Sequence, residues 1–117
     1  MKKILFTITL SALLLSGGCM TNSVSGTWVG GCETSDGKRG EHISLKLHQH
    51  GNKITGTSFD EKGATAKIRG TIKGNSIKLE LSDTNFMLRM AGIVQKKNIT
   101  GIWASDDQTG SWIVRKK

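Results

Sequence analysis

The sequence contains no proline, only two cysteines and no long hydrophobic run. Its longest uncharged apolar stretch, residues 4–15, is about half of the roughly 20 residues that a helix needs to span a bilayer, so we expect no permanent transmembrane helix. After residue 25, no apolar pattern repeats with the period of a helix. Two cysteines allow one disulfide at most. These absences favour a β-rich domain.

Motifs of known catalytic chemistry are also missing. The chain has no Ser-His-Asp spacing, nucleotide-binding loop, pair of catalytic carboxylates or Cys-x-x-Cys. A nucleophile made of Cys32 and a histidine would require the cysteine to leave the inward face of its strand. The acidic pairs at 60–61 and 106–107 lie beside turn-forming residues, so we expect them to shape loops rather than to bind calcium. We expect no enzyme and no cofactor.

Three histidines provide a candidate metal-ligand pattern. His48 and His50 are two positions apart, and His42 lies on the same face of the expected strand. Such a pair can chelate a transition metal, but a useful site needs a third ligand, for which Asp36 or Glu41 is the candidate. Solvated histidines on a basic face are the simpler interpretation. We therefore expect no metal site.

The N-terminal segment has the features of a secretion signal. Two lysines at 2–3 precede the apolar stretch, and three small residues at 16–18 follow it. A positive start, an apolar middle and small residues at the end are typical of a cleaved signal peptide.

The segment "LLLSGGC" resembles the lipobox of bacterial lipoprotein leaders, with Ser16 at the position where leucine is usual. The resemblance implies that Cys19 becomes the first residue of the mature protein and carries an acyl anchor. Ordinary secretion with cleavage nearby is the alternative. In a Gram-negative host, Met20 after the cysteine resembles an outer-membrane sorting signal. The resemblance then implies a lipoprotein of the outer membrane that faces the periplasm.

The resemblance divides the chain into a signal peptide over 1–18, a lipidated cysteine with a short tether over 19–25, and a β-domain over 26–117. Without the two leader lysines, 15 basic residues remain against 9 acidic ones in 99 residues, a length that fits one domain. The basic residues are scattered, as on a solvated surface, so we expect no nucleic acid as partner, while an anionic membrane surface fits. With Cys19 acylated, the fold cannot depend on a disulfide, and we expect Cys32 to be a small buried residue.

Beyond residue 25, apolar and polar residues alternate, and Gly, Asn, Asp or Lys interrupts the alternation at intervals of about eight to twelve residues. This pattern is typical of short strands joined by tight turns. We expect strands over residues 25–34, 41–50, 53–59, 64–73, 76–82, 85–95, 98–104 and 110–116.

The hairpins can be tested by their register. If residues 74–75 form a two-residue turn, Ile72 faces Ile77, and both strands have one apolar face. The same test on turns at 96–97 and 51–52 also gives consistent apolar faces. Consecutive hairpins without long crossovers form a meander, in which the first and the last of eight strands can pair and leave no sheet edge. We expect an all-β, eight-stranded antiparallel up-and-down barrel, with a β-sandwich as the alternative.

Gly26 and Trp28 form the Gly-x-Trp with which barrels of the calycin group begin, so the domain resembles lipocalins, fatty-acid-binding proteins and avidins. The resemblance implies that a basic residue at the last strand packs across this tryptophan and closes the barrel, and Arg115 is placed to do so. The segment "ITGIWASDDQTGSWIVRK" is similar to the last hairpin of avidin-like barrels. Because the chain has no tyrosine and no set of polar residues for the ureido group of biotin, we do not expect it to bind biotin.

An eight-stranded barrel is wide enough either to be filled by its own side chains or to hold one small ligand. Inward glycines such as Gly70 and Gly92 add no volume, so they either leave a pocket or let the strands bend. For a hollow barrel, we expect the pocket to be lined by Trp28, Phe86, Leu88, Met90, Trp103 and Trp112.

These alternatives lead to two functions. The first is a membrane-anchored lipoprotein that binds a small hydrophobic ligand; its tether over 20–25 reaches only about 20 Å, so a guest could pass between barrel and membrane. The second is a surface-acting envelope protein, an inhibitor or assembly accessory, whose filled barrel binds a protein or polysaccharide. Its surface would be the basic outer face with two exposed apolar residues, namely Lys46, His48, Lys67, Arg69, Lys73, Lys78 and Arg89 with Met87 and Ile93.

Overall fold

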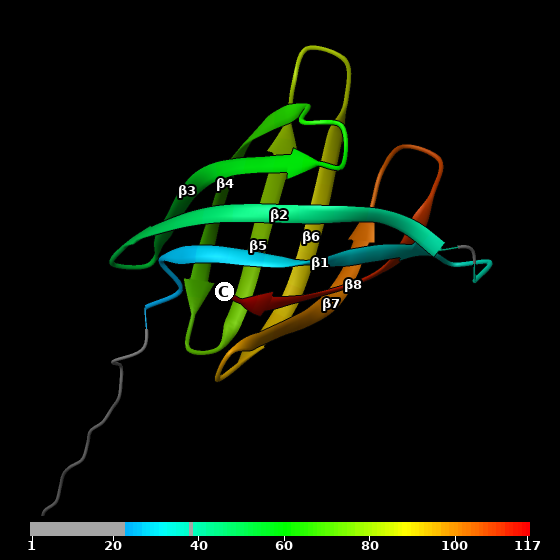
Figure 1. Cartoon of the computed structure of the whole chain (residues 1–117). Coiled ribbons are helices and arrows are strands. Elements are labelled where there is room, and N and C mark those ends of the chain that lie inside the picture. The colour runs from blue at the N-terminus through cyan, green and yellow to red at the C-terminus, as the bar shows by residue number, and fades with distance from the viewer. Residues whose placement is uncertain (1–22, 38) are drawn as a thin grey trace, which may run out of the picture.

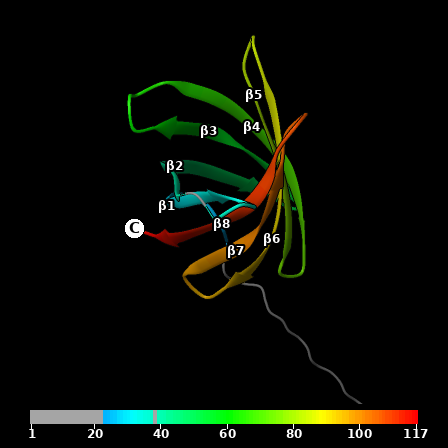
Figure 2. The same ribbon diagram turned by 90° about the vertical axis from the view of Figure 1, so that its right-hand side faces the viewer.

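The computed structural model describes residues 23–37 and 39–117, without the side chains of Arg39 and Glu41. The expected signal peptide, the acylated Cys19 and residues 20–22 of the expected tether lie outside the described residues. Within them, antiparallel strands follow one another in chain order and close into a barrel (Figure 1, Figure 2). No helix in this part of the chain is long and apolar enough to cross a bilayer.

The strands are β1 (Gly26–Thr34), β2 (Arg39–His50), β3 (Lys53–Asp60), β4 (Thr65–Lys73), β5 (Ser76–Ser82), β6 (Met87–Gln95), β7 (Asn98–Ala104) and β8 (Thr109–Lys116). Each strand pairs with its neighbours in the chain, and β1 also pairs with β8, from Trp28 opposite Lys116 to Thr34 opposite Gly110. The expected all-β, eight-stranded up-and-down barrel is confirmed, and the sandwich is excluded.

Two-residue turns set the register of the hairpins, as expected. Ile72 lies opposite Ile77 around the turn that starts at Gly74, and the turn at 96–97 gives the expected apolar pairing of β6 with β7. The first turn residue has a positive φ in both cases, 61° at Gly74 and 52° at Lys96. Glycine adopts such a φ freely, whereas a residue with a Cβ atom is strained there. The turn at 96–97 therefore forms although lysine is unfavourable at its first position.

Strand β6 starts two residues later than expected because the chain first makes a turn at Asp83. The Asp83 carboxylate accepts hydrogen bonds from the backbone N–H groups of Asn85 (2.6 Å) and Phe86 (3.1 Å). The Asp83 N–H donates to the Phe86 carbonyl at 3.1 Å. Phe86 thus lies in a loop and is 47% exposed, not on an inward strand position as expected.

The core fills the inside of the barrel with apolar side chains from every strand. It also includes Val24, which precedes β1 and is 1% exposed. Val24 falls in the segment that the sequence predicts as tether, so the chain joins the core two residues before its first strand. The closed sheet and the apolar core both lie within residues 24–116. This meets the requirement that an independently folding domain has its own hydrophobic core.

Candidate functional site

The two ends of the barrel differ. At one end, which we call the closed end, the turns at 51–52, 74–75 and 96–97 meet residues 23–26 and the end of β8. At the other, the open end, four-residue loops follow β1, β3, β5 and β7. A ligand that enters the barrel along its axis has to pass through one of these two ends.

Trp28 plugs the closed end. Its indole is 1% exposed, and its Nε1 donates a hydrogen bond of 2.9 Å to the Val24 carbonyl. The Val24 N–H in turn donates to the side-chain oxygen of Gln49 at 2.9 Å. The ammonium of Lys116 lies 5.7 Å from the centroid of the Trp28 ring and donates to the Ser23 carbonyl at 3.2 Å. These contacts hold the segment before β1 across the opening.

The cation beside Trp28 is Lys116, which corrects the expectation of Arg115. The register of β1 and β8 places Trp28 opposite Lys116, and Val29 opposite Arg115. Because side chains alternate along a strand, Lys116 lies on the inward side with Val114, and Arg115 points outward. The last strand does supply a basic residue to the closed end, but at the next position.

The middle of the barrel is filled. Trp112 is 2% exposed, and its Nε1 donates to the carbonyls of Ala91 (3.2 Å) and Ile102 (3.1 Å). A Cβ atom on Gly92 would lie 2.9 Å from the Trp112 ring, and one on Gly101 would lie 1.8 Å from the Ala91 carbonyl oxygen. These inward glycines therefore make room for an indole and for closely spaced strands, and they do not leave empty space.

The open end contains a cavity of about 350 Å³, which we call the mouth. Phe86, Asp60 and Asp83 line it on the loop side, and both carboxylates accept hydrogen bonds from backbone N–H groups of their own loops. The inward-facing residues that line it are Cys32, Ile43, Ser58, Ala66, Leu81 and Trp103. The mouth is thus a mainly apolar cavity with acidic groups at its rim.

Ser58 is a buried polar residue in the wall of the mouth. It is 6% exposed and lies opposite Leu45 and Ala66 on the neighbouring strands. Among the described residues, no hydrogen bond involves its hydroxyl. Burial of an unbonded hydroxyl costs about 1–3 kcal/mol. The mouth therefore presents a polar group that a ligand or a water molecule can bind.

Trp103 forms a fixed aromatic wall of the mouth. Its Nε1 donates to the backbone carbonyls of Glu33 and Ser111, both at 3.1 Å. The indole packs over Gly110, where a Cβ atom would lie 2.6 Å from the ring. Because these contacts fix the ring before any ligand arrives, an apolar molecule can pack against it at little entropic cost.

The structure separates the expected lining residues into two groups. Phe86 and Trp103 line the mouth. The other four pack in the core, and they are Trp28, Leu88, Met90 and Trp112. Sequence reasoning missed Ser58 as a site residue, although alternation after Ile54 places it inward.

The histidines do not form a metal site with other described residues. The rings of His48 and His50 on β2 meet edge to face, with 4.4 Å between their centroids. Within the described side chains, no group of three His, Cys, Asp or Glu residues comes together. The Glu41 side chain, one candidate for the third ligand, lies outside the described residues.

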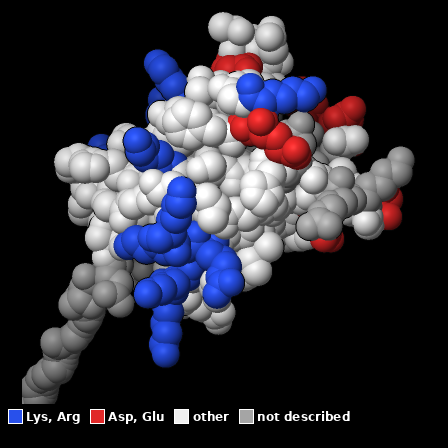
Figure 3. Space-filling view, viewed as in Figure 1, with Lys and Arg blue, Asp and Glu red and all other residues white. Residues whose placement is uncertain are grey.

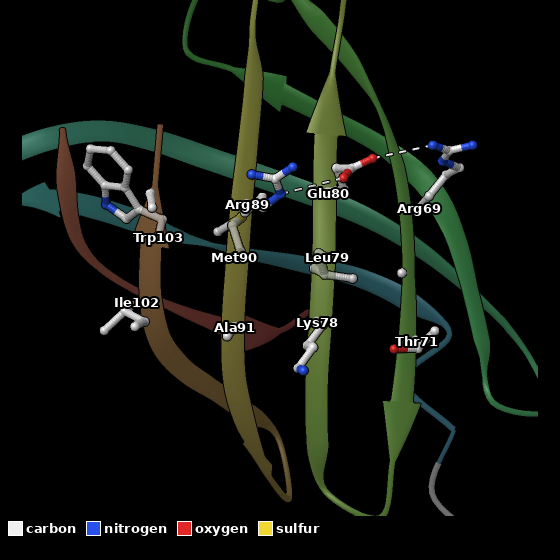
Figure 4. Close-up of a pocket in the computed structure, with 12 residues that line it drawn as sticks. Arg69, Thr71, Lys78, Leu79, Glu80, Arg89, Met90, Ala91, Ile102 and Trp103 are labelled. Atoms are coloured by element: carbon white, nitrogen blue, oxygen red, sulfur yellow. Dashed lines mark hydrogen bonds and ion pairs between the residues drawn. The ribbon is translucent and has the colours of Figure 1, made fainter. Parts of the chain in front are cut away.

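A second hollow, which we call the outer groove, crosses the outside of β4 to β7 and has a volume of about 550 Å³. Figure 4 shows Glu80 between Arg69 and Arg89 along this wall, at nitrogen–oxygen distances of 3.3 and 3.8 Å. Ala91 and Ile102 contribute apolar surface, and Ile102 is 68% exposed. The groove combines exposed apolar groups with part of the expected basic face.

No family model and no curated protein matches the sequence significantly. The fold is similar to that of bradavidin2 in complex with biotin, with a TM-score of 0.60 and 13% identity over 82% of this chain and 99% of that one. It is also similar to a redesigned β-barrel bound to DFHBI (TM-score 0.61, 13% identity, 80% and 94%). A third neighbour is fatty-acid-binding protein 1 of Echinococcus granulosus (TM-score 0.50, 12% identity, 80% and 96%). At these identities the likeness shows the fold alone, which is a calycin-like eight-stranded barrel.

Proposed function

We propose that this protein is a membrane-anchored lipoprotein whose barrel binds one small, mostly apolar molecule in the mouth. The observation that carries the proposal is the cavity of about 350 Å³ at the open end of an otherwise filled barrel. Ligand sites typically measure roughly 300–1,000 Å³ and combine apolar walls with a few polar groups. The mouth has this composition, with Trp103 as an aromatic wall and Ser58 as a buried hydroxyl.

The solved barrels of the same fold support a binding role. One was solved with biotin, one with DFHBI, and one is named as a fatty-acid-binding protein. Fold similarity does not transfer a ligand, so the ligand's chemistry has to come from the mouth itself.

Size and charge narrow the ligand class. The mouth is at the small end of the usual range, and a long acyl chain would need the space that Met90 and Trp112 occupy. The carboxylates of Asp60 and Asp83 disfavour an anionic ligand at the rim. We therefore propose a neutral or cationic molecule with an apolar body against Trp103 and one polar group that bonds to Ser58.

The neutral dye Prodan tests this proposal, because it has a flat apolar body and one carbonyl group, and its emission shifts to the blue in an apolar site. We expect saturable binding of Prodan and weaker binding of the anionic dye ANS. Ala66→Leu should fill the mouth and abolish Prodan binding, while Ala91→Leu, the same change on the outer wall, should retain it. Circular dichroism checks that both variants fold. Equal binding by the two variants would contradict a site in the mouth.

The anchor depends on Cys19, which lies outside the described residues. We expect labelled palmitate to be incorporated into the wild type and into Cys32→Ala, but not into Cys19→Ala. The wild type and Cys32→Ala should partition into the detergent phase, and Cys19→Ala should not. In a Gram-negative host the wild type should sediment with the outer membrane. Labelling that survives in Cys19→Ala would contradict acylation at this residue.

The outer groove favours a second candidate function. Ile102, which is 68% exposed, lines the groove together with Arg69 and Arg89. Met87 and Ile93 are 44% and 42% exposed on β6, which carries Arg89. As the alternative, we propose that an envelope protein or polysaccharide docks on this wall. A partner captured from envelope extracts and reconstituted from pure components should lose affinity for Arg69→Glu/Arg89→Glu. Unchanged affinity would count against this function, and Lys62→Glu at an open-end loop is the control.

A further inference from the structure

Charged residues are separated along the barrel axis. Basic side chains gather at the closed end, beside its turns and at the end of β8 (Figure 3). In addition to Lys116 at the Trp28 plug, they are Lys53, Lys73, Lys96, Lys97, Arg115 and Lys117. No described Asp or Glu lies on the turns or strand ends of the closed end.

The described acidic residues lie elsewhere. Those of the open end, on or next to its loops, are Glu33, Asp36, Asp60, Glu61, Asp83, Asp106 and Asp107. Figure 3 shows most of the acidic side chains towards the upper right and most of the basic ones to the left and below. Glu80 lies between the ends and pairs with Arg69 and Arg89. No described Asp or Glu side chain therefore compensates the positive side chains of the closed end.

Backbone hydrogen bonds join the closed-end turns into one rim. The Val94 N–H donates to the Asn75 carbonyl at 2.8 Å, which links the turn at 74–75 to β6. The Lys116 N–H donates to the Lys97 carbonyl at 2.7 Å, which links the turn at 96–97 to the end of β8. Because the turns are fixed side by side, the basic side chains that flank them share one surface.

The chain reaches the barrel at this same end. The Ser23 carbonyl accepts a hydrogen bond from Lys116, and Val24 is buried in the core. Four peptide steps separate Ser23 from Cys19, which is about 14 Å at full extension. An acyl group on Cys19 would therefore hold the basic rim close to a bilayer, at a distance comparable to the screening length of about 8–10 Å.

We propose that the closed end is a docking surface for a bilayer that contains anionic phospholipids. The position of this surface near the bilayer rests on the proposed lipid anchor. Its affinity for anionic lipid comes from the basic residues of the barrel's own rim. Each Lys or Arg near an anionic surface contributes about a fivefold gain in binding. Salt screens such contacts, so the affinity depends strongly on ionic strength.

The test uses residues 20–117, which contain the complete barrel and lack Cys19. We measure cosedimentation with vesicles of phosphatidylcholine alone and of an equal mixture of phosphatidylcholine and phosphatidylglycerol, at low and high salt. The wild type should bind the mixed vesicles at low salt only. Lys96→Gln/Lys97→Gln/Lys117→Gln should weaken this binding about a hundredfold. The control Lys62→Gln/Lys67→Gln/Arg89→Gln loses the same net charge towards the open end and should weaken it less than about fivefold.

Three results would overturn the docking surface. The first is that the wild type binds neither kind of vesicle. The second is that the two triple variants weaken binding equally, in which case net charge alone is responsible. The third is that the barrel binds heparin but not the mixed vesicles, which would point to a polysaccharide. Because the tested protein lacks Cys19, these failures leave the palmitate experiment unaffected, and the two proposals fail separately.

Discussion

Removal of the Ser58 hydroxyl should change two measurements in opposite directions. Ser58→Ala deletes a buried polar atom that has no hydrogen-bond partner among the described residues, so the unliganded barrel should become more stable. The same atom is the one that we propose bonds to the ligand, so the affinity for Prodan should fall.

The magnitudes follow from the burial of Ser58 and the position of the mouth. An unbonded hydroxyl costs about 1–3 kcal/mol, and water in the mouth places the gain for Ser58→Ala at the lower end, about 1 kcal/mol. In a domain of this size, that raises Tm by about 4–8 °C. A hydrogen bond contributes about 0.5–1.5 kcal/mol to binding, so the Kd for Prodan should rise roughly 2- to 13-fold.

Urea unfolding followed by circular dichroism gives the stability, and Prodan titration gives the affinity. Ser44→Ala is the matched control, because Ser44 lies on β2 between the inward Ile43 and Leu45 and points away from the mouth. Ser44→Ala should neither raise the stability in urea nor raise the Kd for Prodan. If Ser58→Ala unfolds at a lower urea concentration than the wild type, the hydroxyl is bonded in the unliganded barrel and the reasoning is refuted. An unchanged Kd would remove Ser58 from the binding site.

Further substitutions test the turn, the strand spacing and the plug. Lys96→Gly relieves the positive φ of 52° and should stabilise the barrel by about 1 kcal/mol in urea unfolding; a lower urea midpoint would show that no strain is stored there. Gly101→Ala places a Cβ atom 1.8 Å from the Ala91 carbonyl oxygen, so thermal unfolding should show a loss of more than about 3 kcal/mol. Trp28→Phe leaves the Val24 carbonyl without its donor and should cost about 1–3 kcal/mol, with faster proteolysis before β1. Wild-type stability and proteolysis in that variant would contradict the plug.

The sequence predicts the strands and registers well because three of the seven connections between strands are turns of only two residues. A two-residue turn leaves no freedom in pairing, and an apolar face that appears on both strands, as for Ile72 and Ile77, identifies the correct turn. Closure by β1 and β8 then follows from an even number of strands without crossovers. Local spacing was therefore sufficient for the fold.

The two misplaced residues had local signals. Phe86 follows Asp83, whose side chain can bond to backbone N–H groups two and three positions later, so the turn was encoded in the sequence. Lys116 shares the parity of the inward Val114, whereas Arg115 does not. The expectation for Phe86 followed its apolar side chain rather than the turn signal of Asp83. The expectation for Arg115 followed the family resemblance rather than the alternation of side chains along the strand.

The mouth could not be located from the sequence. Alternation identifies Trp103 and Trp112 equally as inward residues, but it does not say which indole fills the barrel and which one borders a cavity. That depends on where each ring finds acceptors for its N–H group: Trp112 at Ala91 and Ile102, and Trp103 at Glu33 and Ser111 near the open end. Two of these contacts, Trp103 with Glu33 and Trp112 with Ala91, join residues 70 and 21 positions apart, and no local pattern records them.

The mouth and the first described residues of the chain lie at opposite ends of the barrel. With Cys19 in the lipid and the basic rim on the head groups, the mouth would open into the aqueous compartment. A guest dissolved in the membrane would have to enter water first, unlike the direct passage that a short tether suggests. The barrel would then sample the aqueous phase and collect solutes that diffuse freely or arrive on a soluble carrier. Its natural ligand would be a molecule soluble enough to travel, such as a signal or a nutrient.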